Sequence, residues 1–424
     1  MTAALARAHR KAGRQVRVFK CGPDFLDPMV LEAASGAPVH QLDLFMLGEA
    51  GCRRLLYDAA READLILIEG AMGLFDGEPS AADIAARFGL PVMAVIDASA
   101  MAQTFGAIVK GLASYRFDVE LTSVLANRVG SARHASLLEQ AMPAGIRWLG
   151  AFARDKDAAL PERHLGLVQA LEIGDLETRL DALASALPES ALELPRPVRF
   201  TPPPPAALPG RWLDGQRIAV ARDAAFSFIY PANLATLESM GATLDFFSPL
   251  ADDPVPDCDA LWLPGGYPEL YLERLSGNDR MLASLRAHHA ADKPILAECG
   301  GMLLCCESLT DAQGVTMPMA GIMPGTATVQ PRLAALGLQE LMGEEESLRG
   351  HTFHYAALAT SLTPAMQASY PDYREGEPVY RHGSLTATFL HSYFASSPRL
   401  TLRLFGLPPV ERSRELAFDA CQTS

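Results

Sequence analysis

The sequence lacks two motifs that identify a protein class directly, a phosphate-binding loop and a membrane-spanning segment. No Gly-Lys-Ser or Gly-Lys-Thr tripeptide occurs, so the chain has no phosphate-binding loop of the form G-x-x-x-x-G-K-[ST]. No segment approaches the roughly 18 consecutive apolar residues of a membrane-spanning helix. The stretch from Met1 to Arg17 is basic but has no apolar core segment, so we expect neither a signal peptide nor a membrane partner.

Basic residues are scarce, and the cysteines are few and irregularly spaced. The chain has 36 Lys and Arg against 50 Asp and Glu, a formal net charge of -14. This balance argues against nucleic acid as a partner, and an acidic substrate would need local basic groups or a metal. Seven cysteines, an odd number, do not form a disulfide framework and favour a reducing, cytoplasmic location.

The chain is long enough for two domains, because it has 424 residues of which 49% are hydrophobic. In the first half, strand-like and helix-like segments alternate, which predicts a parallel, doubly wound α/β sheet. The expected strands are 16–20, 65–69, 92–97 and 121–127, and the expected helices are 2–12 and 81–88. A Pro-rich stretch centred on 201–205 suits an extended linker, and a second α/β domain starts at 217. We predict domains at 1–186 and 215–424 with a linker at 187–214.

The stretch 293–304 contains the strongest candidate for a nucleophile. An apolar run after Pro294 ends at Cys299, which is followed by two glycines and a second apolar run, so we expect a strand, a sharp turn and a helix. A cysteine at a helix N-terminus has a lowered thiol pKa, which favours the nucleophilic thiolate. The alternative is a buried structural cysteine, as we expect for Cys305 and Cys306.

Two further stretches of the second half supply what a nucleophilic cysteine needs. The run 260–269 is a short apolar strand that ends at Gly265 and Gly266, where a backbone N–H could approach a developing oxyanion. The run 386–394 places His391 in a β-prone segment, where imidazole could act as general base and acid. An ordinary loop and a structural histidine are the alternatives.

Two loops of the first half carry unusual acidity. Lys20, Asp24 and Asp27 follow the strand at 16–20, while Glu69 closes the next strand and Asp76 lies in a Gly-punctuated loop. Both loops follow the carboxyl ends of parallel strands, where such sheets bind ligands. Carboxylates gathered there need a cation, which points to Mg²⁺, and Lys20 is placed for a phosphate. The alternative is that these are exposed turn residues.

The motifs resemble those of one enzyme family. The order G-G-Y-P-E, A-E-C-G-G and a C-terminal strand histidine resembles the class I glutamine amidotransferase domain of corrin amidases. The loops F-K-C-G-P-D-F-L-D-P and E-G-A-M-G-L-F-D-G, together with R-G-H-T-F-H-Y at 349–355, resemble the cobyrinate or hydrogenobyrinate a,c-diamide synthases. The first domain of that family is similar to dethiobiotin synthetase. The resemblance implies two doubly wound α/β domains, a P-loop NTPase-like synthetase and a glutamine amidotransferase.

That resemblance implies glutamine- and ATP-dependent amidation of the a and c acetate groups of cobyrinic or hydrogenobyrinic acid in cobalamin biosynthesis. The thiol would release ammonia from glutamine, and ammonia would displace phosphate from an acyl phosphate made with ATP. The residues implied are Cys299 and His391 as catalytic; Gly265, Gly266 and Gly300 for the oxyanion and glutamine; Lys20, Asp24, Asp27 and Asp76 for ATP and substrate; and Glu69 and Asp43 for Mg²⁺. Tyr393 stands where many class I relatives carry a carboxylate, so no third triad member is named. For His351 and His354 we prefer a structural or substrate-contact role over a metal pair.

The family begins with a strand and a P-loop, and here Met1 to Ala12 instead resembles the helix that follows them. Either the chain is shortened or the nucleotide site is lost, and we favour the first because the acidic residues that serve the nucleotide are present. That strand lies inside the sheet, so we expect unpaired strand edges in the first half. The alternatives for function are another tetrapyrrole, such as nickel sirohydrochlorin, or a non-catalytic corrinoid-binding remnant. A homodimer is among the possible assemblies.

Overall fold

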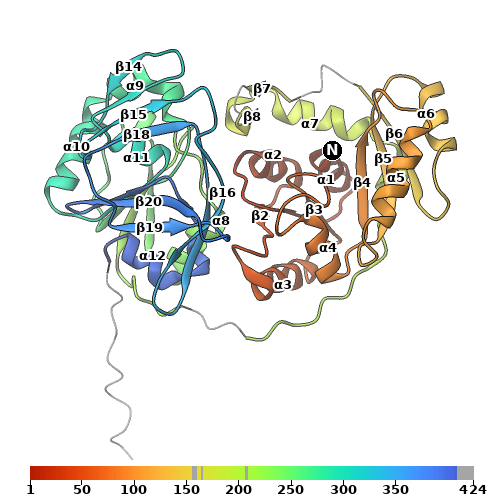
Figure 1. Cartoon of the computed structure of the whole chain (residues 1–424), viewed down its shortest axis with the longest axis horizontal. Coiled ribbons are helices and arrows are strands. Elements are labelled where there is room, and N and C mark those ends of the chain that lie inside the picture. The colour runs from red at the N-terminus through yellow and green to blue at the C-terminus, as the bar shows by residue number, and fades with distance from the viewer. Residues whose placement is uncertain (155–159, 164–165, 206–208, 408–424) are drawn as a thin grey trace, which may run out of the picture. The chain divides into compact units, whose positions relative to one another are not determined.

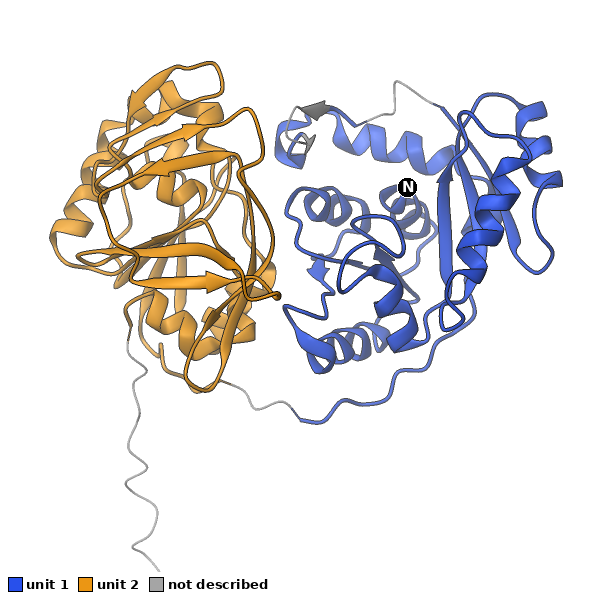
Figure 2. Cartoon of the chain, in the orientation of Figure 1, with its two compact units in different colours: residues 1–205 blue, residues 206–424 orange. Residues whose placement is uncertain are grey.

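The computed structural model describes residues 1–154, 160–163, 166–205 and 209–407. The chain divides into two compact units, unit 1 at residues 1–205 and unit 2 from residue 206 onward (Figure 2). The division falls within the predicted linker. None of the helices in the described ranges is both long and apolar enough to cross a membrane.

Unit 1 contains two separate three-stranded parallel sheets. One has the order β2-β1-β3 and the other β4-β5-β6, so β3 and β4 each lie at a sheet edge (Figure 1). Val95 of β4 is 39% exposed, which is unusual for a valine in an otherwise apolar strand. Within the described residues, β3 and β4 each pair with a strand on one side only. The strands are β1 (Val16–Lys20), β2 (His40–Gln41), β3 (Leu65–Glu69), β4 (Val92–Asp97), β5 (Leu121–Val129), β6 (Arg147–Ala153), β7 (Glu162–Arg163) and β8 (Gly166–Leu167).

Helices cover both faces of the first sheet, as expected for a doubly wound unit. Val16 and Val18 of β1 pack with α1, α2 and α7 on one face, while Phe19 packs with α3 and α4 on the other. This alternation follows from the two-residue period of a strand. The helices are α1 (Thr2–Lys11), α2 (Leu26–Ser35), α3 (Gly48–Ala60), α4 (Ala81–Phe88), α5 (Thr104–Ser114), α6 (Ala132–Gln140) and α7 (Leu176–Ser185), with 3₁₀ turns η1 (Ala170–Glu172) and η2 (Glu189–Leu192).

Unit 2 is built on a ten-stranded mixed sheet of order β10-β9-β11-β12-β21-β20-β19-β16-β17-β22. Strands β10 to β21 in that order are parallel, and the rest of the sheet is antiparallel. The strands are β9 (Arg217–Ala221), β10 (Thr243–Phe247), β11 (Ala260–Leu263), β12 (Ile295–Glu298), β16 (Ala335–Met342), β17 (Ser347–His354), β19 (Met366–Ser369), β20 (Glu375–His382), β21 (Leu385–Thr388) and β22 (His391–Ser392). A second sheet holds β13 (Ser308–Thr310), β14 (Thr316–Pro318), β15 (Thr326–Val329) and β18 (Ala356–Ala359).

The parallel strands of unit 2 are buried on both faces. On one face Ile218, Val220 and Trp262 form a core with Leu296, and on the other Leu261 and the neighbouring strand residues pack on α11. Each fully buried Leu or Ile contributes about 1.5–3 kcal/mol, so this core fixes the strand ends on which the candidate site stands. The helices are α8 (Pro231–Ser239), α9 (Leu272–Ser276), α10 (Asp279–Ala290), α11 (Gly300–Cys305) and α12 (Pro398–Leu404), with 3₁₀ turns η3 (Pro249–Ala251), η4 (Pro268–Tyr271) and η5 (Phe394–Ser396).

Candidate functional site

Cys299 is the single residue between the end of β12 and the start of α11. This is the strand, turn and helix that the sequence predicts here. Its φ of 46° is a conformation that residues with a Cβ seldom adopt. The backbone holds it in place, because Cys299 N–H donates to Thr388 O at 2.7 Å and Leu303 N–H donates to Cys299 O at 3.0 Å. A strained residue kept by its surroundings is typical of a functional turn.

Glycines allow the turn to approach the loop after β11. A Cβ at Gly300 would lie 2.9 Å from both Gly266 N and Gly266 O, and a Cβ at Gly266 would lie 2.0 Å from Ala225 O. Real Cβ atoms do not come this close to backbone, so only glycine fits at either position. The two predicted glycine loops therefore pack backbone against backbone beside Cys299.

Gly265 lies between the two predicted catalytic side chains. A Cβ there would meet His391 Cε1 at 2.2 Å, His391 Nδ1 at 2.9 Å and Cys299 Cβ at 3.4 Å. The thiol and the imidazole thus flank the same point, although they lie 92 residues apart in the sequence. Cys299 is 5% exposed and His391 is 2% exposed, so both are shielded from water.

Gly265→Ala is expected to lower glutamine hydrolysis by about a hundredfold, because the new methyl group would displace the imidazole, and small misplacements of catalytic groups cost that much. The ammonia released from glutamine measures the effect. Gly277→Ala is the matched control, since a Cβ there meets nothing closer than 3.4 Å. Equal rates in the two variants would contradict the positioning of His391 against Gly265.

His391 is held by aromatic neighbours. Its strand β22 pairs with β17, where it lies opposite His351, and the two rings stack with centroids 5.0 Å apart. The Nδ1 atom of His351 is hydrogen-bonded to the hydroxyl of Tyr230 at 2.9 Å. Phe228 lies on another side, with ring centroids 6.0 Å apart. Tyr393, for which we expected no catalytic carboxylate, is buried, and its ring packs on that of Tyr230 with centroids 5.5 Å apart.

Glu298 is a buried residue of this site that sequence reasoning did not single out, although it precedes Cys299 in the motif. Its two oxygens accept hydrogen bonds from Ser392 N at 2.9 Å and from Trp262 Nε1 at 3.0 Å. It therefore ties the end of β12 to the strand that carries His391. Burial raises its pKa to about 7.

This raised pKa predicts that Glu298 contributes more to the stability of unit 2 in mild acid than at neutral pH. The folded pKa of about 7 lies above the ordinary value of 4.5, so the stabilisation is complete below pH 4.5 and is lost as the pH rises through 7. The contribution of Glu298 to the free energy of unfolding should fall by up to about 1.4 kcal/mol per pH unit in that window. Urea unfolding of the wild-type chain and of Glu298→Gln at pH 5 and 7 measures it, because the wild-type stability relative to the variant should be lower at pH 7 than at pH 5. The same difference between the two proteins at both pH values would contradict the assignment.

Burial, not the helix N-terminus, dominates the protonation of the predicted catalytic pair. Desolvation and then the charge of Glu269 raise the pKa of the Cys299 thiol, and the Gly300 N–H lowers it by less. Our expectation that the helix N-terminus lowers this pKa overall was therefore wrong. Desolvation also lowers the pKa of His391. The resting pair is therefore a neutral thiol beside a neutral imidazole.

The predicted acidic loops of unit 1 meet at the end of the first sheet. A Cβ at Gly22 would lie 3.5 Å from Ala71 Cβ, so the loops after β1 and β3 are in contact. The cation that lies among their carboxylates is Lys20, which pairs with Glu69 at 3.1 Å, with Asp24 at 3.5 Å and, more closely, with Asp27. Its side chain is 3% exposed. Burial and the neighbouring Asp27 raise the pKa of Asp24 to about 6.

Asp43 and Asp76 do not join the ion pairs of Lys20. One oxygen of Asp43 accepts from the N–H groups of Phe45 and Met46, both at 2.8 Å, which makes it a buried turn cap. Asp76 is exposed, and its N–H donates to Gly73 O at 3.0 Å. In residues 1–154, 160–163, 166–205 and 209–407, no group of three or more His, Cys, Asp or Glu is arranged to hold a metal ion. The predicted Mg²⁺ ligands thus form no ready-made metal site.

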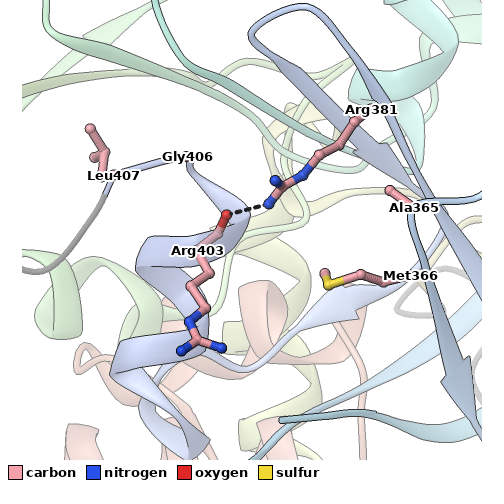
Figure 3. Close-up of a pocket in the computed structure, with 6 residues that line it drawn as sticks. All are labelled: Ala365, Met366, Arg381, Arg403, Gly406 and Leu407. Atoms are coloured by element: carbon pink, nitrogen blue, oxygen red, sulfur yellow. Dashed lines mark hydrogen bonds between the residues drawn. The ribbon is translucent and has the colours of Figure 1, made fainter. Parts of the chain in front are cut away.

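Both ring nitrogens of His354 are engaged, one with Glu377 Oε1 at 3.0 Å and the other with Ala356 O at 2.8 Å. Its ring also stacks on Phe389 with centroids 3.7 Å apart. This geometry supports a structural role for the R-G-H-T-F-H-Y segment. Figure 3 shows a hollow elsewhere in unit 2, where Arg381 donates to Arg403 O at 2.8 Å, and none of the predicted site residues lines it.

Comparisons with known proteins agree with this two-part organisation. A CobQ/CobB/MinD/ParA nucleotide binding domain matches residues 1–168, and a CobB/CobQ-like glutamine amidotransferase domain matches residues 217–399. These matches confirm the predicted fold class.

Relatives match the chain over nearly its whole length. Hydrogenobyrinate a,c-diamide synthase of Pseudomonas aeruginosa is 57% identical, with 95% of this chain and 93% of that one covered. The protein of the same name from Stutzerimonas stutzeri is 58% identical, covering 94% and 93%. Cobyrinate a,c-diamide synthase of Herminiimonas arsenicoxydans is 50% identical, covering 96% and 93%. With identity this high over both domains, the chain belongs to the family of the hydrogenobyrinate and cobyrinate a,c-diamide synthases.

Proposed function

We propose that this chain is an ATP-dependent carbon–nitrogen ligase that amidates the a and c acetate groups of hydrogenobyrinic or cobyrinic acid with nitrogen from glutamine, in cobalamin biosynthesis. The observation that carries the proposal is that Cys299 and His391 both lie next to Gly265, in a chain 57% identical to a hydrogenobyrinate a,c-diamide synthase. A thiol and an imidazole shielded from water beside closely packed glycine backbone suit the splitting of a carboxamide.

In the glutaminase reaction, Cys299 Sγ attacks the carboxamide carbon of glutamine while His391 accepts the thiol proton. The C–N bond then breaks, His391 gives that proton to the leaving nitrogen as ammonia departs, and a thioester remains. Water attacks the thioester, with His391 taking its proton and returning it to the thiolate as glutamate leaves. Because the thiol proton moves to His391 while Sγ attacks, no free thiolate has to form in the buried site. This agrees with a neutral thiol and a neutral imidazole before the reaction.

The oxyanion of each tetrahedral intermediate would be stabilised by backbone N–H groups of the glycine loops. Gly266 and Gly300 pack against each other beside Cys299, and Gly265 leaves room for the imidazole. Donors fixed in place before the reaction stabilise developing charge without reorganisation, which is why such loops accelerate acyl transfer strongly. These three glycines are also proposed to line the glutamine site.

In the synthetase reaction, a substrate carboxylate oxygen attacks the γ-phosphorus of ATP, ADP leaves, and ammonia displaces phosphate from the acyl carbon. We assign ATP and substrate contacts to the strand-end cluster of Lys20, Asp24 and Asp27 and to the loop residue Asp76. When ATP binds, the ammonium group of Lys20 would leave its carboxylate partners and pair with a phosphate, so this buried charge would stay paired.

Magnesium is proposed to enter with the nucleotide, since Mg²⁺ in such sites commonly takes only one or two protein carboxylates together with phosphate oxygens. Glu69, at the end of β3, and Asp43 would be those carboxylates. The metal would supply positive charge against the phosphates. Glu69 is paired with Lys20, so it would have to leave that ion pair to bind the metal. In Asp43 one carboxylate oxygen caps a turn, and the other would be the metal ligand.

Transfer of labelled nitrogen tests the proposal directly. Because the chain as written has no P-loop, it is first joined to the strand and P-loop that open the family's first domain. This longer form is incubated with hydrogenobyrinic or cobyrinic acid, ATP, Mg²⁺ and glutamine labelled with ¹⁵N in its side-chain amide, and the mass of the product is measured by mass spectrometry. Two ¹⁵N-labelled amides per macrocycle are expected, against none without ATP. Amides formed without the label, or on a different tetrapyrrole only, would contradict it.

The proposed location is the cytoplasm, and the proposed assembly is a homodimer. All six described cysteines are free thiols, which agrees with a reducing cytoplasm as the proposed location. A homodimer stays a proposal, and light scattering against the chain mass of 45.5 kDa decides it.

A further inference from the structure

Three carboxylates raise the pKa of the Cys299 thiol through their charge. Glu298 and Glu377 are buried, and Glu269 is half-buried with a buried Oε2 atom. Two of them have protein partners. Glu298 accepts from Ser392 N and Trp262 Nε1, and Glu377 accepts from Thr352 Oγ1 at 2.8 Å and is paired with His354. Such partners are what buried carboxylates normally have.

Glu269 differs from the other two. Its Oε2 is buried and has no hydrogen-bond partner within the residues that the structure describes, and the one group that favours its charge is its own backbone N–H. An unsatisfied buried carboxylate oxygen is costly, so its retention in a native fold calls for an explanation. Burial raises the pKa of this carboxyl to about 7.

The place of Glu269 connects it with the predicted glutamine site. It lies in η4, directly after the loop of Gly265 and Gly266, and a Cβ at Gly300 would lie 2.9 Å from Pro268 Cδ. The turn that carries Glu269 therefore packs on the start of α11. Of the three carboxylates, its charge acts most strongly on the thiol.

We propose that Glu269 binds the α-ammonium group of glutamine, so that the site selects a free amino acid over an N-acylated one. The inference rests on the proposed glutaminase function of Cys299. A primary ammonium supplies the donors that Oε2 lacks, and it carries the charge that a buried carboxylate needs. Because the ammonium neutralises Glu269, substrate binding also removes the carboxylate charge that most disfavours the thiolate.

Glu269→Gln tests this assignment, since the amide keeps the size and removes the charge. Glutamine and N-acetylglutamine hydrolysis are measured in the wild-type chain and in the variant. The wild-type chain is expected to prefer glutamine, and the variant to lose about 10- to 100-fold in kcat/KM for glutamine, mainly through KM, with little change for N-acetylglutamine. Glu273→Gln, an exposed residue on the following helix, is the matched control and should change neither.

The outcomes separate the two proposals. A wild-type chain that hydrolyses neither compound would refute the nucleophilic role of Cys299, whereas a variant with an unchanged preference would refute only the role of Glu269. Alkylation of Cys299 by iodoacetamide, which carries no ammonium, checks that the variant is folded around its thiol. We expect this alkylation to be as fast as in the wild-type chain or faster, because the variant lacks the carboxylate charge that disfavours the thiolate. Slower alkylation would contradict this effect of Glu269 on the thiol.

Discussion

Replacing Cys299 with alanine is expected to lower glutamine hydrolysis by at least about a thousandfold, because removal of a nucleophile leaves only binding and oxyanion stabilisation to act on the substrate. Ammonia or glutamate release measures the rate. The fold should survive, since Cys299 packs at the edge of a large core and alanine leaves only a small space. In a form of the enzyme that carries the P-loop, amidation with ammonium at high concentration should remain where glutamine no longer serves.

Cys305→Ala is the matched control for this prediction. Cys305 is fully buried on the same helix, and loss of its thiol changes packing but not chemistry. Its rate per folded molecule should stay within a few-fold of the wild-type rate. Similar losses in the two variants would show that the elbow matters for structure and not for catalysis.

Replacing Lys20 with methionine is expected to destabilise unit 1 by about 3 kcal/mol at pH 7. The ammonium lies among Asp24, Asp27 and Glu69, and removing one partner of a buried ion pair leaves the others uncompensated. Urea unfolding measures the loss, with the fluorescence of the tryptophan of unit 1 as the signal. The tryptophans of unit 2 are distinguished by the separate unfolding transition of that unit.

The pH dependence of the Lys20→Met loss has a definite sign. The pKa of Asp24 already lies above its ordinary value and should rise further without the ammonium, so the variant gains stability when the pH falls and Asp24 takes up a proton. The difference from wild type should therefore shrink from pH 7 to pH 4. Lys11→Met removes an exposed lysine paired with Asp181 at 3.4 Å, and it should cost less than about 1 kcal/mol. An equally small loss in the free energy of unfolding for Lys20→Met would contradict the claim that Lys20 is paired within a buried cluster.

The elbow at Cys299 was predictable because its determinants are local. Pro294, a four-residue apolar strand and a Gly-Gly pair follow one another in 294–301, and the structure places β12 and α11 there. The same holds for β1, β3 and α4, whose predicted bounds match the structure. Local order of apolar residues, glycines and caps was enough for these elements.

The partners of the site residues were not predictable, because they come from distant parts of the chain. Glu298 meets Ser392, and His351 meets Tyr230, over 94 and 121 residues respectively. The pKa of Cys299 depends on how completely the fold excludes water, which a motif does not encode. The sequence predicted Lys20 as a phosphate contact, and the structure adds that its ammonium is paired with Asp24, Asp27 and Glu69.

The central claim is that Cys299 is the thiol that takes the acyl group of glutamine. A glutamine analogue with a diazoketone in place of the carboxamide alkylates such a thiol irreversibly, and peptide mass spectrometry identifies the modified residue. We expect one modification per chain, on Cys299, that excess glutamine prevents and that His391→Ala slows. An unmodified Cys299, or labelling of another cysteine at the same rate, would contradict the account.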